Sequence, residues 1–189
     1  MTAEEFADQI YDLPEGGRWT ELIAGAMVTL DPPDDAHGNC VRNLATILAE
    51  YAQRSERGYA CFDLGIIVER SPDTVQFPSA CYFLDGPRFS EQDKQVTESR
   101  PALVIEIAST NDRRKTMQAR VDRYLEKLVP RVWVIDPHGR QVHIFQPGAN
   151  PRTFKEHETL RGEGTLPDSQ LPVSSLFVEP DWWAAPRKK

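Results

Sequence analysis

The sequence predicts an α/β (α+β) domain in which a mixed β-sheet is flanked by helices. Two observations lead to this prediction. Segments whose apolar residues recur at three- and four-residue steps, as in helices, are interspersed with short runs rich in β-branched and aromatic residues, as in strands. In addition, residues 102–136 read as a strand, a helix and a second strand, an arrangement that joins parallel strands through a right-handed crossover.

The N-terminal part of the chain predicts a short helix followed by a hairpin. Thr2 and Glu5 have the spacing of a capping box, so we expect a helix over about residues 3–10. Residues 19–30 then contain two short apolar runs separated by Ala24–Gly25. This pattern indicates two strands joined by a tight turn.

A long amphipathic helix is expected next. From His37 onward the apolar residues recur with helical spacing over about four turns, and the helix ends before Gly58. Either Asp34 or Asp35 is suited to cap its first turn. His37 lies on the buried side of the helix start, where we expect a hydrogen-bonded histidine without a catalytic role.

The central part of the chain predicts two strands and then a loop. Residues 59–70 and 74–84 are strand-like and are separated by a Ser-Pro-Asp turn. Residues 85–100 are polar and are expected to form a loop. Residues 102–109 predict a further strand, which is apolar on both faces and therefore buried on both.

A second amphipathic helix is expected after this strand, with Asn111 and Asp112 at its start and Pro130 beyond its end. Its buried face is expected to consist of Met117, Val121, Tyr124, Leu125 and Leu128.

The C-terminal part predicts a hairpin and then shorter strands. Residues 131–136, with Trp133 in the core, form a buried strand, and residues 141–147 form its hairpin partner. Two weaker strands are expected near residues 152–156 and 158–160, followed by a coil-rich end.

Length and composition indicate one soluble globular domain. A chain of 189 residues with 40% hydrophobic and 27% charged residues is expected to form a single domain over residues 1–175, with a tail at 176–189. The first residues are acidic where a secretory signal would be basic and then apolar, and no run approaches the length of a membrane span. We therefore expect a cytoplasmic protein that does not enter the membrane.

Cysteine spacing and net charge narrow the possible functions. Cys40, Cys61 and Cys81 are odd in number and contain no CxxC pair, which disfavours a disulfide framework or a structural zinc site and favours reduced thiols. A net charge of -7 disfavours tight nonspecific binding to nucleic acid, because that affinity comes mostly from Lys and Arg. A local basic patch remains compatible with this total.

The segment ALVIEIAS, residues 102–109, places one charged residue, Glu106, in an apolar strand. An isolated buried carboxylate costs several kcal/mol unless it is paired, coordinated or protonated. Arg113 and Arg120 lie two turns apart on one flank of the following helix and could form an ion pair with Glu106. The alternative is that Glu106 belongs to a metal-dependent phosphodiesterase site, and the residues alone leave both possibilities open.

Six segments in order resemble the Uma-two family of the PD-(D/E)xK nuclease superfamily, over about residues 3–175. The segments are ELIAGAMV (21–28), PPDDAHGNCVRNL (32–44), TVQFPSACYF (74–83), PALVIEIAS (101–109), RRKTMQARVDRYLE (113–126) and VPRVWVIDP (129–137). The resemblance implies a restriction-endonuclease-like fold, with DNA as substrate and Mg²⁺ as cofactor. In such a site two carboxylates hold the cation without saturating it, so that the metal keeps water ligands and contacts a phosphate oxygen.

The resemblance also implies roles for particular residues. Glu106 stands at the position of the family's strand glutamate, and Glu21 matches an N-terminal acid, so both are implied metal ligands. Ser79 stands where the family has the Asp of a Pro-Asp pair, and Arg120 stands where it has a Lys. His37 matches a histidine of the family. Serine is neutral and a poor Mg²⁺ ligand, and arginine stays protonated and cannot act as a base.

Two functional hypotheses follow. In the first, which leads, the protein is a Mg²⁺-dependent DNA endonuclease of the PD-(D/E)xK type, with Glu106 as metal ligand and Arg120 as a cation that orients phosphate or water. The ordered set of segments and the charge in the core strand favour it. In the second, it is a catalytically inactive relative that keeps the fold as a binding or interaction module, acting as a monomer or as a homodimer. The replacements at Ser79 and Arg120 and the acidic net charge favour the second.

Overall fold

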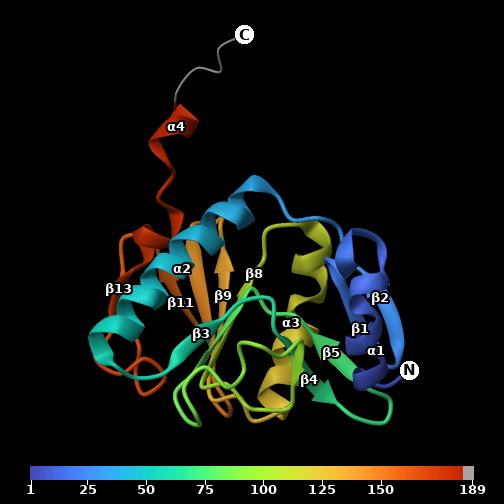
Figure 1. Cartoon of the computed structure of the whole chain (residues 1–189). Helices are drawn as coiled ribbons and strands as arrows, with labels where there is room; N and C mark the ends of the chain where they lie inside the picture. The colour runs from blue at the N-terminus through green and yellow to red at the C-terminus, as the bar shows by residue number, and fades with distance from the viewer. Residues whose placement is uncertain (185–189) are drawn as a thin grey trace.

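The chain forms two mixed β-sheets (Figure 1) and passes between them several times, including at residues 62–64 and 77–79. The computed structural model describes residues 1–184. One sheet has six strands in the order β11-β10-β9-β8-β6-β3, and the other has five in the order β2-β1-β5-β4-β7. A separate pair, β12 and β13, completes the strands. The mixed α+β architecture expected from the sequence is thereby confirmed.

The strands have the following bounds: β1 (Thr20–Ile23), β2 (Ala26–Thr29), β3 (Tyr59–Cys61), β4 (Gly65–Glu69), β5 (Thr74–Gln76), β6 (Ala80–Phe83), β7 (Val96–Thr97), β8 (Leu103–Ile107), β9 (Val132–Asp136), β10 (Gln141–Phe145), β11 (Arg152–Lys155), β12 (Thr159–Arg161) and β13 (Gln170–Pro172). The helices are α1 (Ala3–Gln9), α2 (Asp35–Ser55), α3 (Asn111–Glu126) and α4 (Asp181–Ala184), with 3-10 turns η1 (Ile10–Asp12), η2 (Pro14–Gly17) and η3 (Val173–Phe177).

The expected strands over residues 59–70 and 74–84 are each wrong as single strands, and the mixed strands are divided between two sheets. Each segment contributes one strand to each sheet: β3 and β6 belong to the six-stranded sheet, and β4 and β5 to the five-stranded one. Asp63 has a positive φ of 55° in the first break, and Pro78, which has no N–H for a strand ladder, lies in the second. The expected loop at 85–100 also contains β7, which pairs with β4.

The expected hairpins and the parallel unit are confirmed. β1 pairs with β2, and β9 with β10, both in antiparallel register. β8 and β9 are parallel neighbours, with Glu106 opposite Val134. The strand expected at 158–160 corresponds to β12, whose partner β13 was not expected from the sequence.

Helix starts agree with the sequence better than helix lengths do. The capping box of Thr2 and Glu5 starts α1. Asp34 caps α2 by accepting a hydrogen bond from the His37 backbone N–H at 2.9 Å, and the helix runs for 21 residues, about six turns and longer than expected. The N-cap of α3 is Thr110, one residue before the expected position. Because α3 ends at Glu126, Leu128 is 62% exposed, and its expected place in the buried face is wrong.

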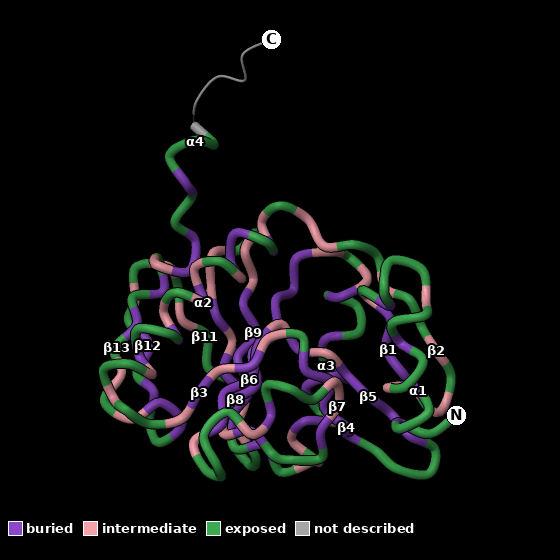
Figure 2. Tube along the Cα trace, viewed as in Figure 1, coloured by how far each residue is buried: buried purple, intermediate pink, exposed green. Residues whose placement is uncertain are grey.

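The elements stack in layers. On one face of the six-stranded sheet, α2 packs through Leu44 and Leu48. On the other face lies α3, whose Val121 and Tyr124 share a core cluster with residues of both β8–β9 and β4. The far face of the five-stranded sheet is covered by α1 through Phe6. Figure 2 shows that the strands between these helices are largely buried. Helix α3 therefore lies between the two sheets.

The packed part of the chain continues past residue 175. Leu176 and Phe177 of η3 are buried in the same core cluster as α2. Beyond them, α4 stands away from the body (Figure 1). The rest of the tail expected at 176–189 lies outside the described residues. Among the helices of the described part, none is long and apolar enough to cross a membrane.

Candidate functional site

The candidate site is built around Glu106, which the central strand β8 directs toward α3. β8 is paired on both sides, with β6 and β9, so all of its residues are buried. Alternate side chains point to opposite faces of a strand. Ile105 and Ile107 accordingly join the cluster under α2, whereas Val104 joins the cluster under α3, on the same side as Glu106. The Glu106 side chain is therefore buried beneath α3, with 0% exposure.

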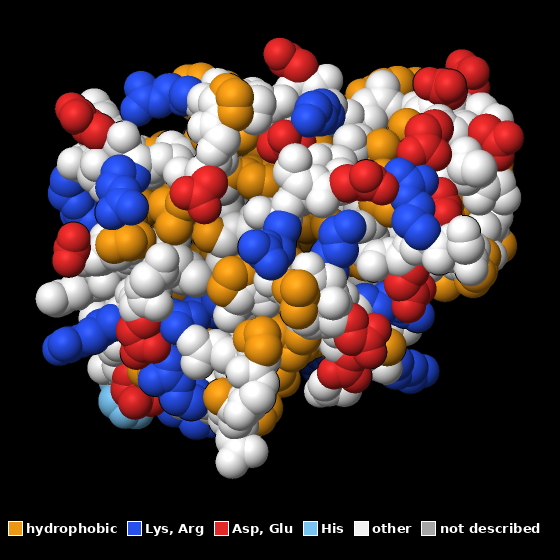
Figure 3. Space-filling view, turned by 90° about the horizontal axis from the view of Figure 1, so that it is seen from below, with side chains coloured by type: hydrophobic (Ala, Val, Ile, Leu, Met, Phe, Trp, Pro, Cys, Tyr) orange, Lys and Arg blue, Asp and Glu red, His pale blue; other side chains and the backbone are white. Residues whose placement is uncertain are grey.

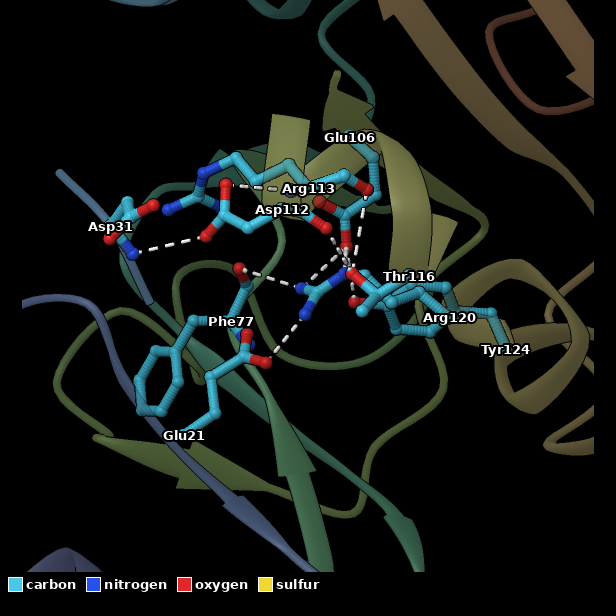
Figure 4. A network of polar contacts seen from close by, with 9 residues as sticks. All are labelled: Glu21, Asp31, Phe77, Glu106, Asp112, Arg113, Thr116, Arg120 and Tyr124. Carbon is cyan, nitrogen blue, oxygen red and sulfur yellow. Dashed lines mark hydrogen bonds and ion pairs between the residues drawn. The ribbon is translucent and has the colours of Figure 1, made fainter. Parts of the chain in front are cut away.

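Helix α3 supplies two polar partners for Glu106 that lie one turn apart, as shown in Figure 4. The Nε and Nη2 atoms of Arg120 donate hydrogen bonds to Glu106 Oε1 at 3.0 and 2.8 Å. The Tyr124 hydroxyl donates to the same oxygen at 2.7 Å. Residues at i and i+4 share one face of a helix, so this spacing brings both groups to one carboxylate oxygen.

The second sheet contributes Glu21 from β1. Arg120 Nη1 donates to Glu21 Oε2 at 2.5 Å, and the Phe77 backbone N–H donates to Glu21 Oε1 at 2.9 Å. The Phe77 carbonyl in turn accepts from Arg120 Nη2 at 3.3 Å. One guanidinium therefore joins a carboxylate of the five-stranded sheet to a carboxylate of the six-stranded sheet. We call Glu21, Glu106, Arg120, Tyr124 and the Phe77 backbone the bridging network.

Burial and charge determine the protonation behaviour of Glu106. Burial raises the pKa of Glu106 above its ordinary value; Arg120 opposes this shift, and the nearby Glu21 adds to it. The shift is upward because burial is the largest of these contributions. Glu106 Oε2 has no hydrogen-bond partner among the described residues, so it is the oxygen free to take up a proton. Burial also raises the pKa of Tyr124 well above its usual range, which keeps its hydroxyl a donor.

The arrangement does not fit Mg²⁺. A magnesium site needs oxygen ligands with free lone pairs and near-octahedral space. Glu106 Oε1 already accepts three hydrogen bonds, both oxygens of Glu21 accept one, and the Arg120 cation lies between the two carboxylates. No cluster of three or more His, Cys, Asp or Glu side chains suited to a metal occurs in the described part of the chain. The guanidinium occupies the position between the acids that a cation would need.

Three of the four site residues expected from the sequence come together, namely Glu21, Glu106 and Arg120. Ser79 lies just beyond Phe77 and is half-buried, and its hydroxyl forms no hydrogen bond to the described residues of the bridging network. The ion pair expected for Glu106 is formed with Arg120. Arg113 instead places its guanidinium over the Trp19 ring, 5.7 Å from the centroid.

His37 lies outside the bridging network and has the hydrogen bond expected for it. Its Nδ1 atom is 3.3 Å from the Ser109 hydroxyl, and the residue is buried at the start of α2. Burial, with a smaller contribution from Arg113, lowers the pKa of His37 to about 4. The imidazole is therefore neutral at pH 7.

Sequence reasoning missed two members of the bridging network. Tyr124 was assigned to the buried apolar face of α3, although its spacing of four residues from Arg120 is a usable signal for a shared partner. The Phe77 backbone was missed because a strand was expected through this position. Its N–H and carbonyl are available to side chains only because β5 ends at Gln76.

Comparisons with known proteins identify relatives of this fold. A solved structure described as a putative nuclease belonging to DUF820 from Anabaena variabilis ATCC 29413 has a similar fold, with a TM-score of 0.74. The two chains are 18% identical, and the similarity covers 90% of this chain and 96% of the other. Residues 3–174 match Uma2, described as "Putative restriction endonuclease". The chain belongs to the Uma2 family. No curated protein matches it in sequence.

Proposed function

We propose that this protein keeps the nuclease fold as a binding module and has lost metal-dependent cleavage of DNA. The observation that carries the proposal is the bridging position of Arg120 between Glu21 and Glu106. A buried cation held by two carboxylates leaves no place for a second cation between them. The same acids that the family resemblance assigns to the metal are here used to bind a side chain of α3.

The residue at position 79 supports the same conclusion. Ser79 stands where the family resemblance implies an aspartate, and its neutral hydroxyl adds no negative charge near the bridging network. With Glu21 and Glu106 both ionised, Arg120 reduces the net charge of this buried group to one negative charge. A divalent cation would gain much less from this group than from three free carboxylates.

A second candidate function is Mg²⁺-dependent DNA endonuclease activity, with Glu106 and Glu21 as metal ligands. It is favoured by the family match and by Glu106 Oε2, a buried carboxylate oxygen that has no hydrogen-bond partner among the described residues. For this function Arg120 would have to leave at least one carboxylate and act on a phosphate. Leaving it would expose two buried acids to one another without a bridging cation, which is energetically costly.

DNA remains the partner class that the family suggests, with the module acting alone or as a homodimer. Nonspecific binding depends on phosphate neutralisation by Lys and Arg, and the net charge of -7 works against it. On the face shown in Figure 3, Lys and Arg side chains are interleaved with Asp and Glu side chains. We therefore expect any DNA affinity to be modest and to decrease as the salt concentration rises.

Titration calorimetry with Mg²⁺ and Mn²⁺ tests the proposal. The parent protein is compared with Glu106→Gln, which keeps an oxygen that can accept from Arg120 and Tyr124, and with the exposed control Glu50→Gln. We expect no binding at millimolar metal in any of the three, and no cleavage of plasmid DNA. Metal binding at millimolar concentration or tighter that is lost only in Glu106→Gln, together with cleavage, would instead establish the endonuclease.

The double variant Ser79→Asp/Arg120→Lys completes this experiment. It restores the charges of the family pattern and removes the planar guanidinium that bridges the acids. If the parent has lost the activity, we expect metal binding and DNA cleavage to appear only in the double variant. Equal cleavage by the parent and the double variant would show that the parent site works as it stands.

A further inference from the structure

Two reduced cysteines outside the bridging network lie opposite each other on neighbouring strands, in the positions of a cross-strand disulfide. Cys61 in β3 and Cys81 in β6 are direct register partners in an antiparallel strand pair. Residues directly opposite in such a pair have Cα atoms about 4.5 or 5.5 Å apart, depending on the hydrogen-bonding position. Disulfides join Cα atoms separated by about 4.4–6.8 Å. The Cα spacing of register partners therefore lies within the range that a disulfide spans.

The two thiols are free and differ in their tendency to ionise. The neighbouring Cys81 side chain lowers the pKa of Cys61, in spite of burial, whereas the pKa of Cys81 is raised well above its ordinary value. The thiolate is the nucleophile in thiol oxidation. Cys61 is accordingly the residue that reacts first, and Cys81 is the residue that resolves the product.

Position in the sheet makes Cys61 the more accessible partner. β3 is the edge strand of the six-stranded sheet, is three residues long and pairs only with β6. Short edge strands open locally at low free energy compared with central strands. Cys40, by contrast, lies within helix α2 in another core cluster, and burial raises its pKa to about 12. The third cysteine therefore serves as an internal reference.

We propose that Cys61 and Cys81 form a redox modification site that a peroxide converts reversibly to a disulfide. The Cys61 thiolate attacks one oxygen of hydrogen peroxide, forming an S–O bond and breaking the O–O bond; the hydroxide released takes up a proton and becomes water. Cys81 then attacks the Cys61 sulfur, forming the S–S bond and breaking the S–O bond, and its thiol proton leaves with the hydroxyl group as a second water. Two thiols lose two electrons, and the peroxide is reduced to two waters.

The disulfide would join the two strands that flank residues 62–79, a segment that leaves the six-stranded sheet, forms β4 and β5 of the five-stranded sheet and returns. The loop that it closes, residues 61–81, contains β4, β5 and Phe77, whose backbone holds Glu21 and Arg120. Closing a loop of this length restricts the unfolded chain. Oxidation is therefore expected to raise the denaturation midpoint of the protein.

Peptide mapping of the full chain tests the site directly. The folded protein is treated with hydrogen peroxide, blocked with N-ethylmaleimide and digested with trypsin without reduction. Cleavage after Arg57, Arg70 and Arg88 places the two cysteines on separate peptides, 58–70 and 71–88. We expect a linked pair of these peptides that disappears on treatment with dithiothreitol, and a decrease from three free thiols to one.

Variants complete the test. The linked pair is expected in Cys40→Ser and absent from Cys61→Ser and Cys81→Ser, and the midpoint is expected to rise on oxidation only where the pair forms. The control for oxidation is an unstructured cysteine peptide treated under the same conditions. If that peptide is fully oxidised while the folded parent keeps three free thiols, the proposal is overturned. The proposal is also overturned if Cys61 forms a disulfide with Cys40 as readily as with Cys81. The same holds if the link between Cys61 and Cys81 forms only in denaturant.

Discussion

Arg120 changes the chemistry of the candidate site because of the shape of its guanidinium. The planar group contacts Glu106 through two nitrogens and Glu21 through the third. A lysine ammonium is a compact charge on a flexible stem and does not reproduce this planar fork. Arginine at position 120, where the family resemblance implies a lysine, therefore keeps the positive charge. It also turns a mobile cation into a fixed link between two strands.

His37 provides a test of local electrostatics. Its folded-state pKa of about 4 lies below the ordinary value of 6.5, so only the unfolded chain takes up a proton between these values. The stability contributed by neutral His37 is fully present above pH 6.5 and is lost as the pH falls toward 4. We expect a loss of roughly 3 kcal/mol across this window.

Chemical denaturation between pH 4.5 and 7.5 measures this effect. Comparing the parent with His37→Gln isolates the contribution of one group, because the carboxylates are common to both. The exposed residue His157 supplies the control His157→Gln. Parallel stability curves for the parent and His37→Gln would contradict the assignment of His37 as a buried neutral histidine.

Individual helices follow local signals that can be tested one at a time. The sequence leaves the cap of α2 open between Asp34 and Asp35, and the structure selects Asp34, whose carboxylate accepts from the His37 N–H. Asp34→Ala is expected to lower the free energy of unfolding by about 1 kcal/mol, measured by urea denaturation. Asp34→Asn should retain most of the stability, since asparagine also caps helices. A larger loss for Asp35→Ala than for Asp34→Ala would show that the cap lies one residue later.

Strands are less local than helices, and their predictions were less accurate. Periodicity identified β8, β9 and the hairpins, because alternation and turn residues lie within each segment. It did not show that residues 59–70 and 74–84 each divide between two sheets. Sheet membership depends on hydrogen-bonding partners that are distant in sequence, and a break at Pro78 or Asp63 redirects the chain without changing its apolar pattern.

The layered arrangement predicts that the two sheets unfold together. Helix α3 packs between them, and Arg120 links Glu21 of one sheet to Glu106 of the other. Phe6 is fully buried on the outer face of the five-stranded sheet, away from the six-stranded sheet. We expect Phe6→Ala to lower the free energy of unfolding by roughly 3–5 kcal/mol. This loss of stability should affect both sheets.

Hydrogen exchange with peptide resolution measures the extent of this coupling. Amides in β1 and β5 report on one sheet, and amides in β8 and β9 on the other. Equal loss of protection in both groups is the expected result. Phe89→Ala, at a phenylalanine that is 51% exposed, is the matched control and should change much less. Loss confined to β1 and β5 would show that the sheets are independent units.

The amino-acid sequence by itself determined the helix starts, the hairpins and the buried strand that carries Glu106, because each depends on residues close together in the chain. The candidates Glu21 and Arg120 came from an ordered set of segments, which is also a property of the sequence. Which arginine pairs with Glu106, and whether the acids are free for a metal, depended on the three-dimensional fold. Glu21 and Arg120 are separated by 99 positions, and only the packing of α3 between two sheets brings them into contact. Contacts of that kind arise from the arrangement of whole layers, which local sequence patterns do not encode.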